Sequence, residues 1–273
     1  MMASRKAKED LAIVTGASRG LGRAIASHLL EAGWRVLGVS RAPAAAEPLP
    51  GVSWLKLDLA DRAQLEAALA FEGGPWSEVG LLVNNAGWAD FGPAETTPPE
   101  SLDGQLETLL RAPMRLSQAV LPGMRRRGRG VIVNVSSLAV EWPIPFLAAY
   151  NTAKAGLSAF SRSLELELAG SGVEVIDFRP GDYRTAFYEA AQRFGGEAPV
   201  LEAAWATMGR RVAASPLPER AASDLGRALA RGQTGPIRSG TWFQAHFASF
   251  AARCLPSSAS AFWIRRYYGM GGL

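Results

Sequence analysis

Three side chains in the middle of the chain have types and a spacing that suit proton transfer. Tyr150 and Lys154 are four residues apart in a stretch with helical periodicity, so both lie on one face of a helix. A tyrosine hydroxyl with an ordinary pKa of about 10 is a poor acid or base at neutral pH, but a nearby lysine ammonium stabilises the phenolate and lowers that pKa. We therefore expect the pair to act as a general acid/base.

A serine strengthens this interpretation, because a Tyr-x-x-x-Lys pair also occurs on ordinary surface helices. Ser137 lies thirteen residues before Tyr150, just after a predicted strand over Val131 to Val135. Ligands of doubly wound sheets bind at the carboxyl ends of the strands. The Ser137 hydroxyl is therefore placed to donate a hydrogen bond to a substrate carbonyl.

A glycine-rich turn near the start of the chain indicates a nucleotide site. Thr15 to Gly22 (TGASRGLG) separates the apolar run Leu11 to Val14 from a helical stretch, Ala24 to Ala32. Phosphates bind backbone N–H groups at a helix N-terminus, where side chains would block their approach. The spacing is neither G-x-G-x-x-G nor a P-loop, which argues against ATP. The candidate residues are Gly16, Ser18, Arg19, Gly20, Leu21 and Gly22.

The end of the second predicted strand indicates which dinucleotide binds. Nucleotide-binding folds usually place an acidic residue there to bind the adenosine ribose, but this chain has Ser40 and Arg41. Arg41 and Arg19 could clamp a 2′-phosphate, which favours NADP(H) over NAD(H). The alternative is two solvated surface arginines. After the third and fourth predicted strands, Asp58 suits the adenine edge, and Asn85, Ala86 and Gly87 let the backbone pass close to the ribose.

Alternating strands and helices are needed to position these residues. Short continuous runs of Val, Ile and Leu predict strands that are covered on both faces, as in a doubly wound, Rossmann-type parallel sheet with helices on both faces. The predicted strands are Leu11 to Val14, Arg35 to Val39, Val52 to Leu57, Gly80 to Val83, Val131 to Val135 and Val173 to Phe178. The predicted helices are Ala24 to Ala32, Arg62 to Phe71, Pro99 to Leu121 and Ala149 to Ala169.

Together these motifs resemble those of the short-chain dehydrogenase/reductase family, in its shorter single-domain branch. The resemblance covers about residues 10 to 190 and runs in the family's order. It rests on Thr15 to Gly22, Asp58-Leu59, Asn84-Asn85-Ala86-Gly87, the Ser137, Tyr150 and Lys154 set, and Pro180-Gly181 with Thr185. It implies hydride transfer between the nicotinamide C4 of NADP(H) and a carbonyl or alcohol carbon.

The resemblance also implies individual roles. Tyr150 would donate the proton during reduction, Ser137 would polarise the carbonyl, and Lys154 would bind the nicotinamide ribose while tuning Tyr150. A dimer or tetramer built on the helices that hold Leu109 and Tyr150 is implied as well. Further cofactor contacts are implied for Asp58, Leu59, Asn85, Ala86, Gly87, Pro180, Gly181 and Thr185.

Two positions depart from the family pattern. Tyr183 stands where members usually carry a small aliphatic residue, which we expect to reshape the pocket. Leu109 stands where members usually have an asparagine that supports a water chain to the lysine. Leucine cannot carry a proton, so Thr108, Gln105 or another group substitutes, or turnover is slower, or the chain is a catalytically impaired NADP-binding sensor or scaffold.

The composition limits the possible domain organisation of the chain and the classes of partner that it can bind. The 273 residues, 48% hydrophobic and 20% charged, suit one catalytic domain over residues 1–240 with an extension over 241–273. A net charge of +4 is a weak indication of nucleic-acid binding, and the basic cluster Arg125 to Arg129 is interpreted as a solvated turn, so no nucleic-acid partner is expected. The single cysteine, Cys254, excludes an internal disulfide, and too few Cys and His residues exist for a structural zinc site. No apolar run reaches a signal-peptide core or the ~20 residues of a membrane span, which favours a cytoplasmic protein.

Large apolar side chains follow three of the predicted strands. They favour a bulky hydrophobic carbonyl or alcohol substrate that is steroid-like, long-chain or aromatic; the alternative is ordinary core beneath a lid. Arg184 is the candidate partner for a substrate anion. The side chains are Trp88, Phe91, Trp142, Pro143, Ile144, Pro145, Phe146, Tyr183, Phe187, Tyr188 and Phe194.

The extension is amphipathic and rich in aromatic residues. Two helical lengths, Trp242 to Cys254 and Ser258 to Tyr268, carry arginines beside aromatic rings. Such a segment could close over the substrate pocket, contact another subunit, or lie on a membrane surface as a peripheral contact. The aromatic residues are Trp242, Phe243, Phe247, Phe250, Phe262, Trp263, Tyr267 and Tyr268.

Overall fold

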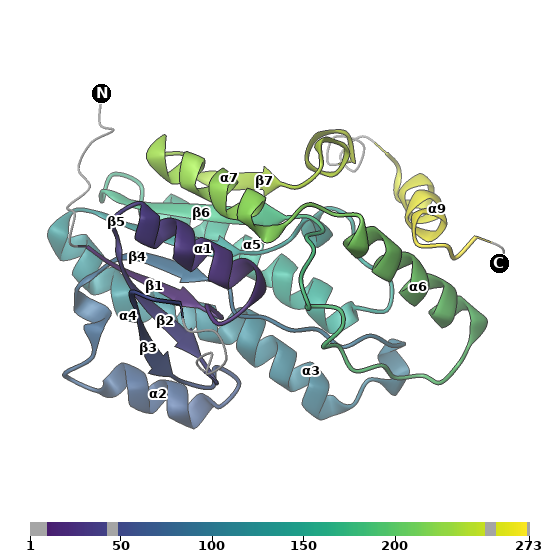
Figure 1. The fold of residues 1–273 in the computed structure, drawn as a ribbon, viewed down its shortest axis with the longest axis horizontal. Helices are drawn as coiled ribbons and strands as arrows, with labels where there is room; N and C mark the ends of the chain where they lie inside the picture. Colours follow the sequence, from purple (N-terminus) through teal and green to yellow (C-terminus); the bar gives the residue numbers. More distant parts are fainter. Residues whose placement is uncertain (1–9, 43–48, 249–254, 272–273) are drawn as a thin grey trace.

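The sheet of this computed structural model is parallel throughout and runs in the order β3-β2-β1-β4-β5-β6-β7 (Figure 1). The structure describes residues 10–42, 49–248 and 255–271. The predicted doubly wound fold is confirmed, and a seventh strand that the sequence did not predict extends one edge. The strands are β1 (Leu11–Thr15), β2 (Arg35–Ser40), β3 (Val52–Lys56), β4 (Val79–Asn84), β5 (Gly130–Val135), β6 (Val173–Pro180) and β7 (Gly235–Ser239).

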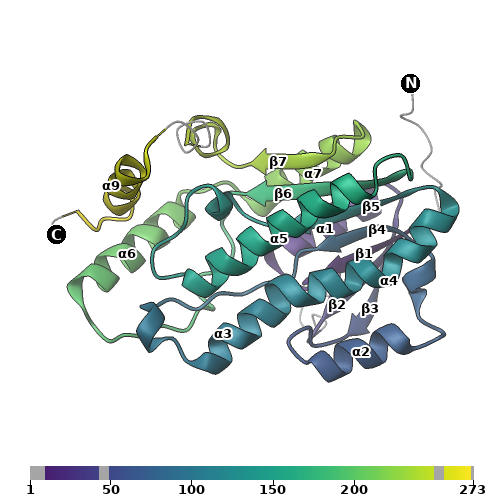
Figure 2. The same cartoon turned by 180° about the vertical axis from the view of Figure 1, so that it is seen from behind.

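Helices cover both faces of the sheet. The face in front in Figure 1 carries α1 (Gly20–Glu31) and α7 (Pro218–Ala230), and Figure 2 shows α4 (Ala112–Arg127) and α5 (Ala148–Glu167) on the other. Beyond the carboxyl ends of the strands lie α3 (Pro99–Leu106), α6 (Pro199–Ala213) and α9 (Ser257–Tyr267), and α2 (Arg62–Ala70) follows β3.

The apolar runs of the strands divide between two cores, one on each face. Ile13 of β1 belongs to the cluster beneath α4, whereas its neighbours Ala12 and Val14 belong to the cluster beneath α1 and α7. Successive strand residues point to opposite faces. Continuous rather than alternating hydrophobicity is therefore what this covered sheet requires.

The prediction of one continuous helix over Pro99 to Leu121 is wrong. It is divided into α3 and α4 by a π-helical turn, Glu107–Arg111. Pro113 has no N–H to donate to the carbonyl of Leu109, four residues earlier, so the regular α-helical ladder cannot continue there. This wider turn holds Thr108 and Leu109 on the buried side of the helix.

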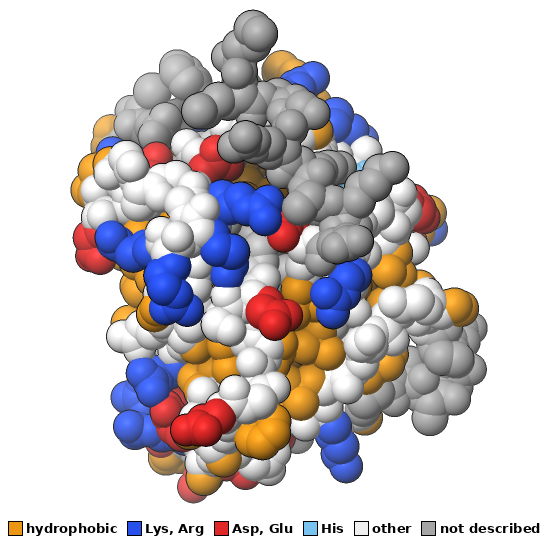
Figure 3. Space-filling model, turned by 90° about the vertical axis from the view of Figure 1, so that its left-hand side faces the viewer, with side chains coloured by type: hydrophobic (Ala, Val, Ile, Leu, Met, Phe, Trp, Pro, Cys, Tyr) orange, Lys and Arg blue, Asp and Glu red, His pale blue; other side chains and the backbone are white. Residues whose placement is uncertain are grey.

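The interpretation of the basic cluster Arg125 to Arg129 as a solvated turn is also corrected. Arg125 to Arg127 form the last turn of α4, where cations suit the helix dipole, and Gly128 ends the helix with a positive φ of 62°. The Arg127 guanidinium donates to the carbonyls of Ser77 and Val79. Part of the cluster is therefore structural. On the face shown in Figure 3, Lys and Arg side chains lie among carboxylates and apolar groups.

The extension begins directly after β7. A π-helical segment, Phe243–Ala248, follows, and α9 then lies beside α6 (Figure 1). The Arg211 guanidinium of α6 lies over the Tyr267 ring at 3.4 Å and donates to the Tyr267 carbonyl at 3.0 Å. Phe250 and Cys254 lie outside the described residues. In the part of the chain that is described, no helix has the length and hydrophobicity to span a membrane.

Candidate active site

A cavity of about 930 Å³ extends from the glycine turn to α9. Every candidate catalytic and cofactor-binding residue of the sequence analysis lines it, although the residues come from widely separated parts of the chain. They are Gly16, Ser18, Arg19, Gly20, Leu21, Gly22, Ser40, Arg41, Asp58, Leu59, Asn85, Ala86, Gly87, Ser137, Tyr150, Lys154, Pro180, Gly181 and Thr185.

The glycine turn is packed against the end of β4 so closely that two positions admit no side chain. Gly16 has a φ of +68°, and a Cβ there would lie 2.8 Å from the Cα of Ala86. A Cβ at Gly22 would lie 2.2 Å from the Gly16 carbonyl oxygen and 2.4 Å from Nδ2 of Asn85. The glycines therefore allow the turn to pack directly against the residues that follow β4.

Hydrogen bonds to Thr15 hold the two walls together. Its hydroxyl accepts from the backbone N–H groups of Asn85 and Ala86, both at 2.9 Å, and donates to the Val83 carbonyl at 3.3 Å. The Asn85 side chain donates in return to the Thr15 carbonyl at 2.9 Å. Asn85 thus faces the cavity as part of a rigid corner.

The residues of this corner fit a dinucleotide phosphate. The helix α1 begins at Gly20, earlier than the predicted Ala24, and no side chain caps its first N–H groups. Arg19 and Arg41 are exposed at the cavity rim, and within the described residues neither guanidinium is paired with a carboxylate. Ser40 donates to the Ser18 hydroxyl at 3.1 Å, which joins the turn to β2.

The three candidate catalytic side chains meet at the opposite wall. Lys154 donates from Nζ to the Val135 carbonyl at 2.6 Å and lies 5.7 Å from the Tyr150 ring centroid. Ser137 follows β5 and caps a 3₁₀ turn, Leu138–Val140, by accepting from Ala139 N–H at 3.0 Å. The Tyr150 hydroxyl shares a hydrogen bond with the Ser137 side chain.

The pKa values differ from the sequence-based expectation. Burial, helped by the Asp182 charge and opposed by the Ser137 hydrogen bond, raises the pKa of Tyr150 to about 12. Burial lowers the pKa of Lys154 to about 8, and the Asp177 charge opposes that change. The expected lowering of the Tyr150 pKa is therefore wrong for this geometry, because burial is the largest influence on that pKa and raises it.

Sequence reasoning missed two charged residues at the substrate end of the cavity. Asp182 follows Pro180-Gly181, accepts from the Gln244 amide at 2.7 Å, and has a pKa that burial raises. Arg211 lines the cavity from α6, and its Nε is buried without a hydrogen-bond partner in the described part of the chain. The proposed anion partner, Arg184, is not part of the lining. The position of Asp182 beside a recognised motif was a usable signal, whereas nothing in the α6 sequence indicated Arg211.

About half of the predicted apolar side chains line the cavity. Phe91 and Phe146 do not; they pack on each other at 5.4 Å in a core cluster that borders the cavity. Tyr183 does reach the cavity, but its hydroxyl is bonded to the Ser239 hydroxyl at 2.5 Å inside the main core. The lining members are Trp88, Trp142, Ile144, Tyr183, Phe187 and Tyr188.

The structure distinguishes between Thr108 and Gln105, the two named candidates to replace the asparagine that is absent at position 109. Leu109 is fully buried against Gly87, where a Cβ would lie 2.7 Å from it. Thr108 lines the cavity, and its hydroxyl accepts from Trp88 Nε1 at 3.3 Å. Gln105 is buried, bonded to Ser101, and not part of the lining. Thr108 is therefore the candidate that presents a hydroxyl to the cavity.

The extension forms the remaining wall. The cavity is lined on this side by Trp263, Ile264 and Tyr268 of α9 and by Phe243 and Gln244 of the preceding segment. Trp242 and Phe262 point elsewhere and are 69% and 61% exposed. Of the three placements that the sequence left open, the described geometry favours closure over the pocket.

Comparisons with known proteins agree with this geometry. The family model "short chain dehydrogenase" matches residues 10–194. An NADP-dependent 3-hydroxy acid dehydrogenase of Salmonella typhi is 34% identical over 177 residues, which is 63% of this chain and 71% of the relative. A 3-ketodihydrosphingosine reductase of Bacteroides thetaiotaomicron is 32% identical over 178 residues, 65% of each chain.

Solved structures extend the similarity beyond the matched region. A short-chain dehydrogenase from Streptomyces avermitilis superposes with a TM-score of 0.79 at 29% identity and covers 98% of this chain and 100% of its own. A short-chain dehydrogenase from Sphingobium yanoikuyae in complex with NADPH has a TM-score of 0.70 at 22% identity, over 90% and 93% of the two chains, a likeness of fold alone.

Proposed function

Because this chain belongs to the short-chain dehydrogenase/reductase family and is an NADP-dependent oxidoreductase of carbonyl or alcohol groups, we propose that its substrate is a bulky hydrophobic ketone or alcohol and that Tyr150 transfers the proton. The observation that carries the proposal is the cavity itself. It joins the glycine corner, the Tyr150 hydroxyl and six large apolar side chains in one space of about 930 Å³.

The nicotinamide of NADP(H) supplies or accepts the hydride when bound. Gly16 to Gly22, Arg19 and Arg41 would hold the phosphates, and Lys154 and Thr185 would lie along the rest of the dinucleotide. Ser137 would donate a hydrogen bond to the substrate oxygen, which orients the carbonyl toward Tyr150. Burial is the main cause that raises the pKa of Tyr150 to about 12. The residue therefore carries the proton at neutral pH, as a donor must, but the raised pKa by itself makes Tyr150 a weaker acid.

NADPH oxidation with a panel of carbonyl compounds tests the proposal. We expect higher kcat/KM for steroid, long-chain and aromatic ketones than for ketones of three or four carbons. Equal rates for all sizes would contradict the substrate class. Tight NADPH binding without turnover of any compound would instead support the catalytically impaired sensor or scaffold.

The extension is proposed to act as a lid on large substrates, and one pair of variants tests this. Trp263→Ala is expected to raise KM for a large ketone about tenfold, which corresponds to about 1.4 kcal/mol of lost apolar burial. Trp242→Ala is the matched control, because Trp242 also belongs to the extension but lies outside the lining. Phe262 does not serve as a control, since its ring packs on that of Trp263 at 5.8 Å. KM for a small ketone should stay unchanged in both, and equal effects of the two variants on the large ketone would contradict the lid.

A substrate that also carries a carboxylate is a second candidate. Arg211 favours it, because its buried Nε lacks a partner in the described part of the chain and its guanidinium lines the cavity. Relatives named as 3-hydroxy acid dehydrogenases point the same way.

A comparison of an oxo acid with its methyl ester distinguishes this second candidate. Arg211→Met is expected to raise KM for the acid about tenfold more than KM for the ester, the equivalent of one charge-assisted hydrogen bond. Any loosening of α9 affects both compounds alike, so the ester is the internal control. A parallel change in both KM values would reject the carboxylate.

A further inference from the structure

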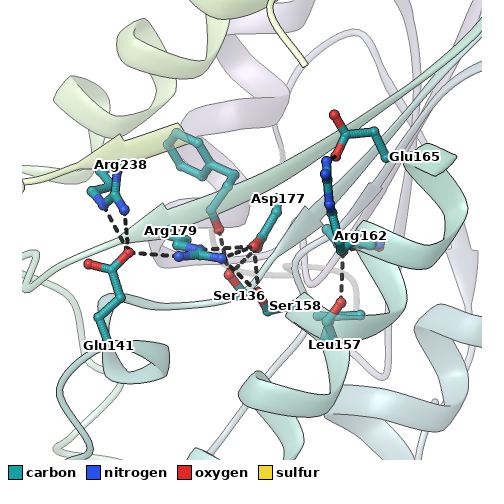
Figure 4. A network of polar contacts seen from close by, with 12 residues as sticks. Ser136, Glu141, Leu157, Ser158, Arg162, Glu165, Asp177, Arg179 and Arg238 are labelled. Atoms are coloured by element: carbon teal, nitrogen blue, oxygen red, sulfur yellow. Dashed lines mark hydrogen bonds and ion pairs between the residues drawn. The ribbon is translucent and has the colours of Figure 1, made fainter. Parts of the chain in front are cut away.

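A network of polar and charged side chains joins the loop after β5 to α5, β6 and β7 (Figure 4). Asp177 of β6 is at its centre and is 3% exposed. Its carboxylate accepts from the hydroxyl of Ser136, from the hydroxyl of Ser158 at 2.7 Å and from Nε of Arg179 at 2.8 Å. The Asp177 carboxylate is thus held in one orientation by side chains from the loop after β5, from α5 and from β6 itself.

The network continues to the far side of the serine loop. Arg179 donates to Oε1 of Glu141 at 2.7 Å, and Arg238 of β7 donates to the same oxygen at 2.6 Å. The side chains of Arg179 and Glu141 are 13% and 9% exposed. Two arginines and two carboxylates thus balance each other in an environment where an unpaired charge would be costly.

This network clamps the catalytic serine from both sides. Ser136 immediately precedes Ser137, and its backbone N–H also donates to the Phe178 carbonyl at 2.8 Å. Glu141 follows the 3₁₀ turn that Ser137 caps. The position of the Ser137 hydroxyl therefore depends on β6 and β7 as well as on the turn that it caps in its own short loop.

The same carboxylate reaches the helix that carries the other two catalytic residues. Ser158 lies one helical turn after Lys154 and two turns after Tyr150, on the buried side of α5. Its hydrogen bond to Asp177 fixes the rotation of α5 relative to β6. One side chain thus connects the serine loop to the tyrosine and lysine helix.

Asp177 also provides a negative charge near the buried ammonium of Lys154. Burial lowers the pKa of Lys154, and the Asp177 charge works in the opposite direction. The groups that face Lys154 are the Tyr150 ring and the Val135 carbonyl. Arg179 faces Asp177, and beyond it lie Glu141 and Arg238; Arg162 and Glu165 pair with each other at the outer side of α5 (Figure 4).

We propose that Asp177 is a positioning residue for the reaction: it aligns Ser137 with Tyr150 and Lys154 through Ser136, Ser158 and the Arg179–Glu141 pair. The proposal rests on the proposed catalytic roles of Ser137, Tyr150 and Lys154. The effect of the Asp177 charge on Lys154, however, is a property of the protein alone and is measurable without a substrate.

The direct test is the titration of Lys154 by NMR of protein with ¹³C-labelled lysine. The chain has only four lysines, Lys6, Lys8, Lys56 and Lys154, so a Lys154→Arg spectrum assigns the signal. The wild-type residue is expected to titrate at about 8. Asp177→Asn removes the charge and is expected to lower that midpoint by about 1 pH unit.

Glu165→Gln is the matched control, because it removes a carboxylate from the same helix outside the network. It should leave the Lys154 midpoint and the turnover unchanged. In Asp177→Asn the alkaline limb of kcat for carbonyl reduction should move to lower pH together with the Lys154 midpoint. A folded Asp177→Asn variant with the wild-type midpoint and pH profile would overturn the proposal.

Glu141→Gln tests the alignment separately and serves if Asp177→Asn does not fold. It weakens the hold of Arg179 and Arg238 on the serine loop, so kcat should fall about tenfold while the NADPH Kd stays unchanged. An unchanged kcat would overturn the proposal. If the wild-type protein turned over no carbonyl compound, the proposed function would fail, whereas the Lys154 titration would still decide the role of Asp177.

Discussion

Tyr150→Phe is expected to lower kcat for carbonyl reduction by about 10³-fold, within the range that general acid catalysis contributes. The variant removes only the hydroxyl, and the ring keeps its edge-on contact with Phe187, whose centroid lies 5.8 Å away. The cavity shape and the glycine corner are untouched. Steady-state NADPH oxidation measures the loss, and NADPH titration should show unchanged affinity.

Tyr188→Phe is the matched control for this prediction. Tyr188 is another buried tyrosine of the same cavity, and its ring packs on Phe187 at 5.5 Å. Burial raises its pKa well above the ordinary value, as it does that of Tyr150. Comparable losses in the two variants would mean that the cavity needs tyrosine hydroxyls in general, and Tyr150 would lose its assignment as the proton donor.

The double variant Arg19→Ala, Arg41→Ala is expected to weaken NADPH binding by about 10²–10⁴-fold, since each hydrogen bond to a charged group contributes about 1.5–3 kcal/mol. Both guanidiniums are exposed at the cavity rim beside the turn and the end of β2. NADH has no 2′-phosphate, so its affinity should change little. Fluorescence titration with both cofactors measures the ratio.

Arg35→Ala is the control, because Arg35 begins β2 at the opposite end of the strand and is exposed. It changes the net charge without reaching the cavity. Equal losses of NADPH and NADH affinity in the double variant would indicate that the arginines support the glycine turn itself. The assignment of the 2′-phosphate to these side chains would then be wrong.

Local patterns sufficed for the part of the site that consists of short motifs. The glycine turn, Asn85 to Gly87 and the Tyr150 and Lys154 pair each lie within one turn or one helix, and strand order then brings them together at one edge of the sheet. The apolar runs identified six of the strands, because most of these strands are buried on both faces, although β3 at one edge is only partly buried. Strand β7 was missed, since Gly235-Pro236-Ile237-Arg238-Ser239 has little of that character at the sheet edge.

Features that depend on long-range packing could not be predicted. Arg211 reaches the cavity only because α9 lies beside α6 and stacks Tyr267 on its guanidinium. Phe91 left the predicted lining because Phe146 and Trp205, distant in sequence, cover it. The direction of the Tyr150 pKa likewise depends on burial, which spacing alone does not report.

The π-helical turn at Leu109 shows the limit of periodicity in another way. Helical spacing continues from α3 into α4, so the pattern predicts one helix, yet Pro113 removes the donor for the Leu109 carbonyl. The resulting turn brings Thr108 to the cavity. The departure from the family pattern at Leu109 is thus accompanied by a hydroxyl from the adjacent residue.

The most direct test of hydride transfer is isotope tracing with NADPH deuterated at C4 of the nicotinamide. Wild-type protein, a bulky aromatic or steroid ketone and either C4 stereoisomer of the labelled cofactor are incubated, and the alcohol is analysed by mass spectrometry. We predict deuterium on the carbinol carbon with one of the two stereoisomers and no labelled alcohol with Tyr150→Phe in the same time. Alcohol formed without deuterium from either stereoisomer, or labelled alcohol formed equally fast by Tyr150→Phe, would contradict the account.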